Sequence, residues 1–146
     1  MKRVTAAILK NGGRILIAKR KETDKLAGKW EFPGGKVKAG ETPQECLARE
    51  MEEEFGIEVN VGAFFGETTH RYASGPIKLI AYHTTWIGGS FSLNAHADVR
   101  WVTPEQFHDF DFAPADMPFV KKLQQKEIWY KLIAEDKTDT NYGSHN

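Results

Sequence analysis

The sequence has little that would place the protein outside the cell, in a membrane or on nucleic acid. It contains a single cysteine, Cys46, so no internal disulfide can form and nothing indicates an oxidising compartment. Lys and Arg together number 20, as do Asp and Glu, whereas proteins that bind nucleic acid usually carry a basic excess. The apolar runs are too short for a membrane-spanning helix or a signal peptide. We therefore expect a cytoplasmic protein that contacts neither a membrane nor nucleic acid.

The pattern along the chain favours an α/β fold around a mixed sheet, because strands and helices mix without a regular βαβ alternation. A length of 146 residues suits one domain. We predict that this domain spans residues 1–135 and that a polar, flexible tail spans residues 136–146. The expected elements are strands over 3–9, 14–18, 57–65, 77–86 and 99–102, a short helix from 103, and a long helix over 117–134.

One further helix has both of its ends encoded locally. Thr42-Pro43-Gln44-Glu45 forms a capping box with proline at the first helical position, and Gly56 suits the left-handed residue that ends a helix. Leu47, Met51 and Phe55 are four residues apart, so they share one stripe that should face the core.

A second face of this helix gathers negative charge. Glu50, Glu53 and Glu54 are spaced i, i+3 and i+4, so they repel one another, and they lie where the helix dipole disfavours anions. A solvated acidic face is the simplest interpretation of such a cluster. The preceding loop changes that interpretation, because residues 32–36 add a glycine turn and the side chain of Lys36. A glycine turn, a lysine and clustered carboxylates together predict Mg²⁺-assisted phosphoryl chemistry.

This region resembles the Nudix family, whose signature is G-x5-E-x7-R-E-U-x-E-E-x-G-U with U an aliphatic residue. The chain has Gly35, Glu41 and then residues 49–57 (REMEEEFGI) at the required spacing, with Met51 at an aliphatic position. The segments EFPGGK, RWVTPEQ and APADMPF look like the MutT and CTP-pyrophosphohydrolase branch of the family. The resemblance implies an α/β/α sandwich around a mixed sheet.

The resemblance also implies roles for particular residues. The expected metal ligands, for Mg²⁺ or a substituting Mn²⁺, are Glu50, Glu53, Glu54 and the carbonyl group of Gly34. Arg49 would hold these carboxylates in place with help from Glu41, and Arg20 and Lys36 would contact phosphates. In this branch, the family's reaction releases a nucleoside monophosphate and pyrophosphate.

One position departs from the family pattern. Relatives often place a further glutamate, used as a base or metal ligand, six residues before the tryptophan equivalent to Trp101, but this chain has Ala95 there. Asn94, His96 or Asp98 could replace it, or the helix glutamates could do the whole task. We expect His96 to lie in a polar surface loop, and we select Asp98 as the candidate catalytic residue.

The base of the nucleotide is the least determined feature. Asp116 lies in the APAD segment, and an ionised carboxylate accepts hydrogen bonds only, which suits the exocyclic amino group of cytosine. Asp116 could instead merely cap the helix that begins at Met117. Three hypotheses remain: a pyrophosphohydrolase of (d)CTP or modified dCTP, an 8-oxo-dGTP diphosphatase, and a Nudix-like domain that binds nucleotides without catalysis. The intact glutamate cluster argues against the third, and the sequence leaves monomer and homodimer open.

Overall fold

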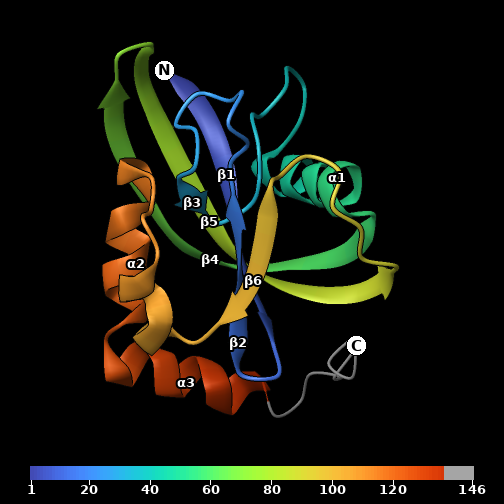
Figure 1. Ribbon diagram of the computed structural model, residues 1–146. Helices are drawn as coiled ribbons and strands as arrows, with labels where there is room; N and C mark the ends of the chain where they lie inside the picture. The colour runs from blue at the N-terminus through green and yellow to red at the C-terminus, as the bar shows by residue number, and fades with distance from the viewer. Residues whose placement is uncertain (137–146) are drawn as a thin grey trace.

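The computed structural model describes residues 1–136 of the chain, and within them a mixed sheet lies between helices (Figure 1). The sheet order is β3-β2-β1-β5-β4, and β6 also pairs with β2. The elements are β1 (Lys2–Asn11), β2 (Arg14–Lys19), β3 (Trp30–Glu31), α1 (Pro43–Phe55), β4 (Ile57–Tyr72), β5 (Gly75–Gly89), β6 (Asp98–Val102), the 3-10 helices η1 (Pro104–Asp109) and η2 (Pro114–Asp116), α2 (Met117–Leu123) and α3 (Lys126–Asp136).

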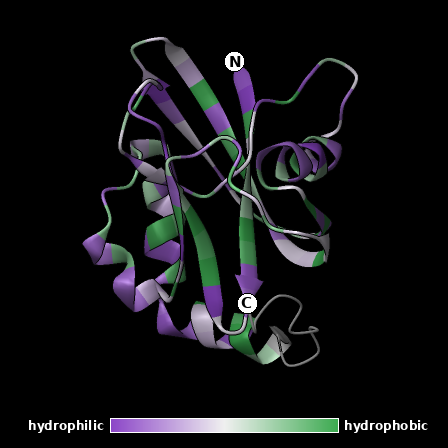
Figure 2. Cartoon of the chain, turned by 45° about the vertical axis from the view of Figure 1, so that its right-hand side comes forward, coloured by the Kyte–Doolittle hydropathy of each residue, from purple (hydrophilic) through white to green (hydrophobic). Residues whose placement is uncertain are grey.

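The central strand β1 explains why the sandwich has a helix layer on each side. β1 runs parallel to β5 and antiparallel to β2. Its residues alternate between two cores: Ala6 and Ile8 pack in the core that includes α2 and α3, whereas Ala7 and Leu9 pack in the core that includes α1. A strand buried on both faces needs a continuous apolar run, as the sequence has here. Figure 2 shows hydrophobic colour along the strands between the helices. The predicted α/β/α architecture is confirmed.

The ends of α1 form as the sequence predicts. The Glu45 N–H donates to Thr42 Oγ1 over 3.1 Å, and the Thr42 N–H donates to Glu45 Oε1 over 2.9 Å. Gly56 takes a left-handed φ of 70° at the C-terminal end. The stripe formed by Leu47, Met51 and Phe55 is fully buried, which turns the other faces of α1 away from its core.

The prediction of one long helix over 117–134 is wrong, because the chain forms α2 and α3 with a break at Gln124 and Gln125. The apolar positions explain the break. Leu123 on α2 and Ile128 on α3 are five residues apart, so on a straight helix they would point about 140° away from each other. The break lets α2 and α3 pack against the same core. The predicted tail begins at Asp136, the last residue of α3, and residues 137–146 lie outside the described part of the chain.

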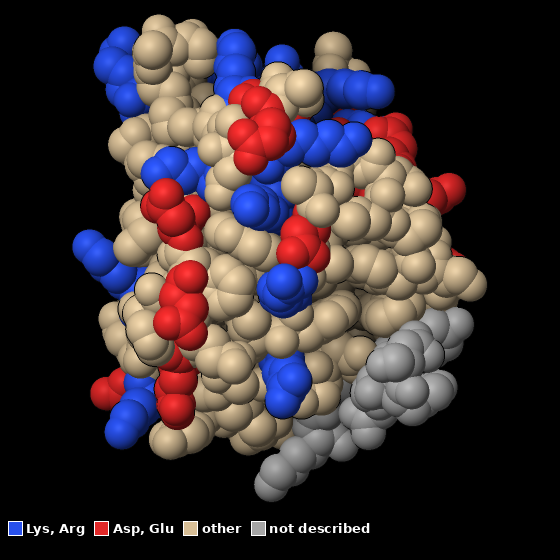
Figure 3. All heavy atoms as spheres, in the orientation of Figure 1, with Lys and Arg blue, Asp and Glu red and all other residues tan. Residues whose placement is uncertain are grey.

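The outer surface of the described residues has mixed character. Positive and negative side chains intermingle on the face drawn in Figure 3, which accords with the balanced composition. No helix among residues 1–136 is both long enough and apolar enough to cross a membrane.

Candidate active site

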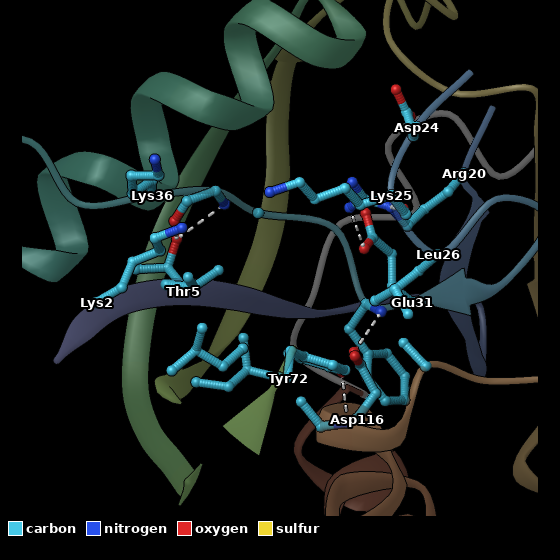
Figure 4. Close-up of a pocket in the computed structure, with 18 of the residues that line it drawn as sticks. Lys2, Thr5, Arg20, Asp24, Lys25, Leu26, Glu31, Lys36, Tyr72 and Asp116 are labelled. Carbon is cyan, nitrogen blue, oxygen red and sulfur yellow. Dashed lines mark hydrogen bonds and ion pairs between the residues drawn. The ribbon is translucent and has the colours of Figure 1, made fainter. Parts of the chain in front are cut away.

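A cavity of about 850 Å³ opens beside the N-terminal half of β1, a size suited to a small-molecule ligand (Figure 4). Its walls come from segments distant in sequence: β1, the loop after β2, β3, α1, the β4–β5 turn, and the segments that contain Ala95 and Asp116. The sequence predicts that the glycine loop and the glutamate face of α1 meet at one site. Residues of both segments line this cavity, which supports the prediction.

Two glycines allow the loop after β3 to pass closely between β1 and α1. A Cβ atom on Gly34 would overlap the backbone carbonyl of Thr5, and one on Gly35 would overlap the Glu50 carboxylate. The carbonyls of Pro33 and Gly35 accept hydrogen bonds from the N–H groups of Ala7 and Thr5, over 2.7 and 2.8 Å. Gly34 lies between Pro33 and Gly35 and lines the cavity, which makes its carbonyl a candidate oxygen ligand.

Arg49 joins the acidic groups of this region into one network. It contacts both oxygens of Glu41, with Nε to Oε2 at 2.6 Å and Nη2 to Oε1 at 2.9 Å. Its Nη1 donates to Glu50 over 2.8 Å and to Glu53 over 3.1 Å. The hydrogen bonds from Arg49, followed by the one from the Lys38 N–H, lower the pKa of Glu41 to about 2. Arg49 thus holds three carboxylates at once, and its support of metal ligands stays a prediction.

The three helix glutamates occupy different environments. Glu50 and Glu54 line the cavity, whereas Glu53 lies outside its lining with a side chain that is 54% exposed. Burial, followed by the charges of Glu50 and Glu31, raises the pKa of Glu54 to about 9. The buried Oε1 of Glu54 has no hydrogen-bond partner among the described residues.

This donor set fits a Mg²⁺ ion bound together with phosphates. Among residues 1–136, no three His, Cys, Asp or Glu side chains already converge in a metal-binding arrangement. Mg²⁺, however, commonly uses one or two protein carboxylates and completes its shell with water and substrate phosphates. Glu50, Glu54 and the Gly34 carbonyl offer such a partial shell, and a cation would stabilise the unpartnered Glu54 oxygen.

The predicted phosphate-binding cations both line the cavity. Arg20 is held by two hydrogen bonds, from Nε to the Lys25 carbonyl at 2.7 Å and from Nη1 to Glu31 Oε1 at 3.1 Å. Lys36 lies near Lys2, whose pKa is lowered chiefly by the charge of Lys36 (Figure 4). Two ammonium groups near one another favour an anion between or beside them. Lys2 and Lys25 also line the cavity, and our sequence analysis did not select them.

The loop before β6 differs from expectation at several positions. Ala95 does line the cavity, so the chain presents a methyl group where relatives often carry a glutamate. His96 is 6% exposed, which makes the prediction of a surface position wrong; its ring instead stacks on Phe55. Asn94 binds the end of α1, because its Nδ2 donates to the Glu53 carbonyl over 3.2 Å.

Asp98, the selected candidate for catalysis, is not brought to the cavity of the described chain. Its side chain is 38% exposed and pairs with Arg100 at 2.8 Å. One of its oxygens also accepts a hydrogen bond from the Val99 N–H over 2.8 Å. These contacts hold the Asp98 side chain at the start of β6, outside the cavity lining. Its catalytic role therefore stays a prediction without geometric support.

Asp116 lies in the wall at the end of the cavity away from α1, and it is 4% exposed. It occupies the position before α2, yet within the described chain its side chain makes no capping hydrogen bond. Its Oδ1 accepts instead from the Phe32 N–H over 3.0 Å. Burial, followed by the charge of Glu31, raises the pKa of Asp116 well above its ordinary value. The alternative of a mere helix cap is therefore wrong.

Sequence reasoning missed Glu31, which lines the cavity together with Tyr72. The Tyr72 hydroxyl accepts a hydrogen bond from the Ala115 N–H over 2.9 Å. Glu31 lies between Arg20 and His96. Glu31 belongs to the EFPGGK segment, and that segment was the one local signal that could have identified it.

Comparison with known proteins agrees with the fold and the glutamate motif. The NUDIX domain family model matches residues 1–123. The chain is 36% identical over 118 residues to the CTP pyrophosphohydrolase of Escherichia coli, covering 81% of this chain and 87% of that one. It is 40% identical over 123 residues to a putative 8-oxo-dGTP diphosphatase 2 of Mycobacterium tuberculosis, covering 82% and 86%.

Solved structures give the same result. The solution structure of the E. coli ORF135 protein has a TM-score of 0.74 at 34% identity, covering 95% of each chain. The crystal structure of a MutT protein from Methanosarcina mazei has a TM-score of 0.76 at 27% identity, covering 86% of this chain and 94% of that one. With the sequence motif, the fold and the relatives in agreement, the chain belongs to the NUDIX domain family and is a Nudix hydrolase.

Proposed function

We propose that residues 1–135 form a Mg²⁺-dependent pyrophosphohydrolase that converts CTP, dCTP or a modified dCTP into the nucleoside monophosphate and pyrophosphate. One observation carries this proposal: a single cavity has oxygen donors and cations at one end and a buried polar residue at the other. A nucleotide has the matching arrangement, with charged phosphates at one end and a base with specific hydrogen-bonding groups at the other.

At the phosphate end, the carboxylates of Glu50, Glu53 and Glu54 and the carbonyl of Gly34 would hold Mg²⁺. Bound Mg²⁺ neutralises phosphate charge and lowers the pKa of water. Arg49 keeps the carboxylates oriented through its contacts with Glu41, Glu50 and Glu53. Arg20 and Lys36 bind the phosphates and hold the polyphosphate chain in place.

At the base end, Asp116 would read the nucleobase. Its Oδ1 is engaged by the Phe32 N–H, which leaves the second oxygen for a ligand. As an ionised acceptor it pairs with the amino group of cytosine and repels the carbonyl of uracil. The identity to the E. coli CTP pyrophosphohydrolase supports this choice.

A second candidate is 8-oxo-dGTP hydrolysis, and the burial of Asp116 favours it. Burial raises the pKa of this carboxyl group, and the neutral acid can donate a hydrogen bond to a guanine carbonyl. The relative from M. tuberculosis carries a name of this kind. The two candidates therefore differ in the protonation state that Asp116 must adopt in the complex.

A nucleotide panel tests both candidates. Wild-type protein is assayed with Mg²⁺ and inorganic pyrophosphatase on CTP, dCTP, 5-methyl-dCTP, UTP, dGTP and 8-oxo-dGTP, with chromatographic identification of the monophosphate. We expect kcat/KM for cytosine nucleotides to exceed that for UTP by about 10²-fold. A preference for 8-oxo-dGTP over every cytosine nucleotide would replace the first candidate with the second. Absence of monophosphate from the whole panel would refute both.

A further inference from the structure

His96 has contacts that its surroundings in the sequence do not suggest. Its ring lies parallel to that of Phe55 on α1, with an interplanar angle of 6° and centroids 5.4 Å apart. Its Nε2 atom is 2.9 Å from Glu31 Oε2 on β3. Its Nδ1 atom is buried and has no hydrogen-bond partner within residues 1–136. His96 is thus held by ring packing on one side and by a single polar contact on the other.

Glu31 contacts Arg20 as well as His96. The two oxygens of Glu31 are divided between partners, with Oε2 beside His96 and Oε1 accepting from Arg20 Nη1 over 3.1 Å. The Arg20 Nε donates to the Lys25 carbonyl. Of the guanidinium nitrogens, Nη2 has no hydrogen-bond partner in the described chain, and Arg20 is one of the cavity-lining residues.

We propose that His96 is a positioning residue, which orients Glu31 so that Glu31 holds the free Nη2 edge of Arg20 toward the phosphates of the nucleotide. Phe55 on α1 contacts His96, His96 contacts Glu31 on β3, and Glu31 contacts Arg20 in the loop after β2. These successive contacts link the three elements. The inference rests on the proposed function, because it assigns the phosphates to Arg20.

His96 affects Arg20 because it occupies one of the two carboxylate oxygens of Glu31 and leaves only the other for Arg20. A carboxylate without a second partner can turn and engage an arginine through two parallel hydrogen bonds, the geometry that these groups prefer. Such a turn would bind Nη2 of Arg20 to Glu31 and leave it unavailable to a phosphate. Holding the arginine in its binding orientation also removes part of the rotamer entropy that phosphate binding would otherwise lose. His96 therefore contributes to phosphate affinity without touching the substrate.

Three histidine variants separate ring packing from the polar contact. His96→Phe keeps a ring against Phe55 and removes Nε2, whereas His96→Gln keeps a nitrogen donor and removes the ring. His108→Phe is the matched control, because His108 also lies beside a carboxylate but is exposed and does not line the cavity. We expect His96→Phe to raise KM about tenfold with a much smaller change in kcat. His96→Gln should recover part of that loss, and His108→Phe should match wild type.

Binding of inorganic tripolyphosphate without metal, measured by calorimetry, supplies a readout independent of turnover. His96→Phe should weaken this binding about tenfold in the wild-type background and have almost no effect in an Arg20→Ala background. Thermal unfolding of each variant shows whether the native fold persists. Equal weakening in both backgrounds, or unchanged tripolyphosphate affinity in a folded His96→Phe protein, would overturn the inference. Wild-type turnover on the nucleotide panel distinguishes that result from failure of the proposed function.

Discussion

The two ends of the cavity are built from different kinds of residues. The end beside α1 is charged and partly exposed, and its carboxylates are neighbours on one helix. The opposite end contains buried Asp116 and half-buried Tyr72, which come from segments far apart in the sequence. Charged groups that handle phosphates can remain accessible to water and ions. Selection of a base depends instead on polar groups that are buried, because an unpaired group costs most there.

The largest expected effect comes from disabling the α1 end. Excess EDTA should abolish turnover, and Glu53→Gln or Glu54→Gln should each lower kcat by about 10³-fold, because the proposed metal site loses charge. Glu52→Gln is the control, since Glu52 is on the same helix but exposed to solvent. The measurement is pyrophosphate release from the best nucleotide of the panel. Full turnover in EDTA, or by either of the first two variants, would remove the metal assignment.

The next effect concerns the residue that organises this end. Arg49→Ala leaves the carboxylates of Glu41 and Glu50 without their cation. We expect a loss of about 10–100-fold in kcat/KM, the usual effect of removing a group that orients metal ligands. Arg14→Ala, an exposed position on β2, is the control. If Arg49→Ala mainly lowers the melting temperature while the folded fraction keeps normal specific activity, Arg49 serves stability instead.

A change at the opposite end should alter selectivity more than rate. Asp116→Asn supplies an amide that can turn and donate a hydrogen bond, so the preference for CTP over UTP should shrink from about 10²-fold toward equality. The same variant should improve turnover of 8-oxo-dGTP. Comparing kcat/KM across the nucleotide panel measures both changes. An unchanged panel would mean that the base is read by other residues.

Acid should lower the stability of the folded protein by protonating Glu41, the partner of Arg49 on α1. Its pKa falls from 4.5 to about 2 in the folded protein, so the ionised, Arg49-bound form stabilises the fold above about pH 4.5. This contribution is lost as the pH drops through the interval between those two values. The difference in urea midpoint between wild type and Glu41→Gln, measured in EDTA, should therefore decline across that interval. A difference that stays constant down to pH 2 would contradict the assignment.

The smallest effect is expected at Asp98. Loss of a general base commonly lowers kcat by about 10²-fold or more. Asp98 pairs with Arg100 outside the cavity lining, so Asp98→Asn should leave kcat nearly unchanged. A fall of the size expected for a general base would restore Asp98 as the replacement for the glutamate missing at Ala95.

The sequence by itself determined α1 and the chemistry that it presents. The capping box at Thr42, the left-handed Gly56 and the spacing of the glutamates act within a few turns of one helix. Local interactions of this kind can be read from neighbouring residues, because helix geometry fixes which side chains share a face. The apolar run of β1 likewise predicted a strand without the need for its partners.

Only the tertiary structure decided the remaining wall of the cavity. Phe32 and Asp116 are joined by a hydrogen bond across 84 residues, and His96 reaches Glu31 across 65. The break between α2 and α3 likewise depends on which core both helices must cover. Such contacts are set by the packing of the whole sheet, and no local propensity records them. His96 looked like a surface residue for this reason, since its polar neighbours in sequence are not its neighbours in space.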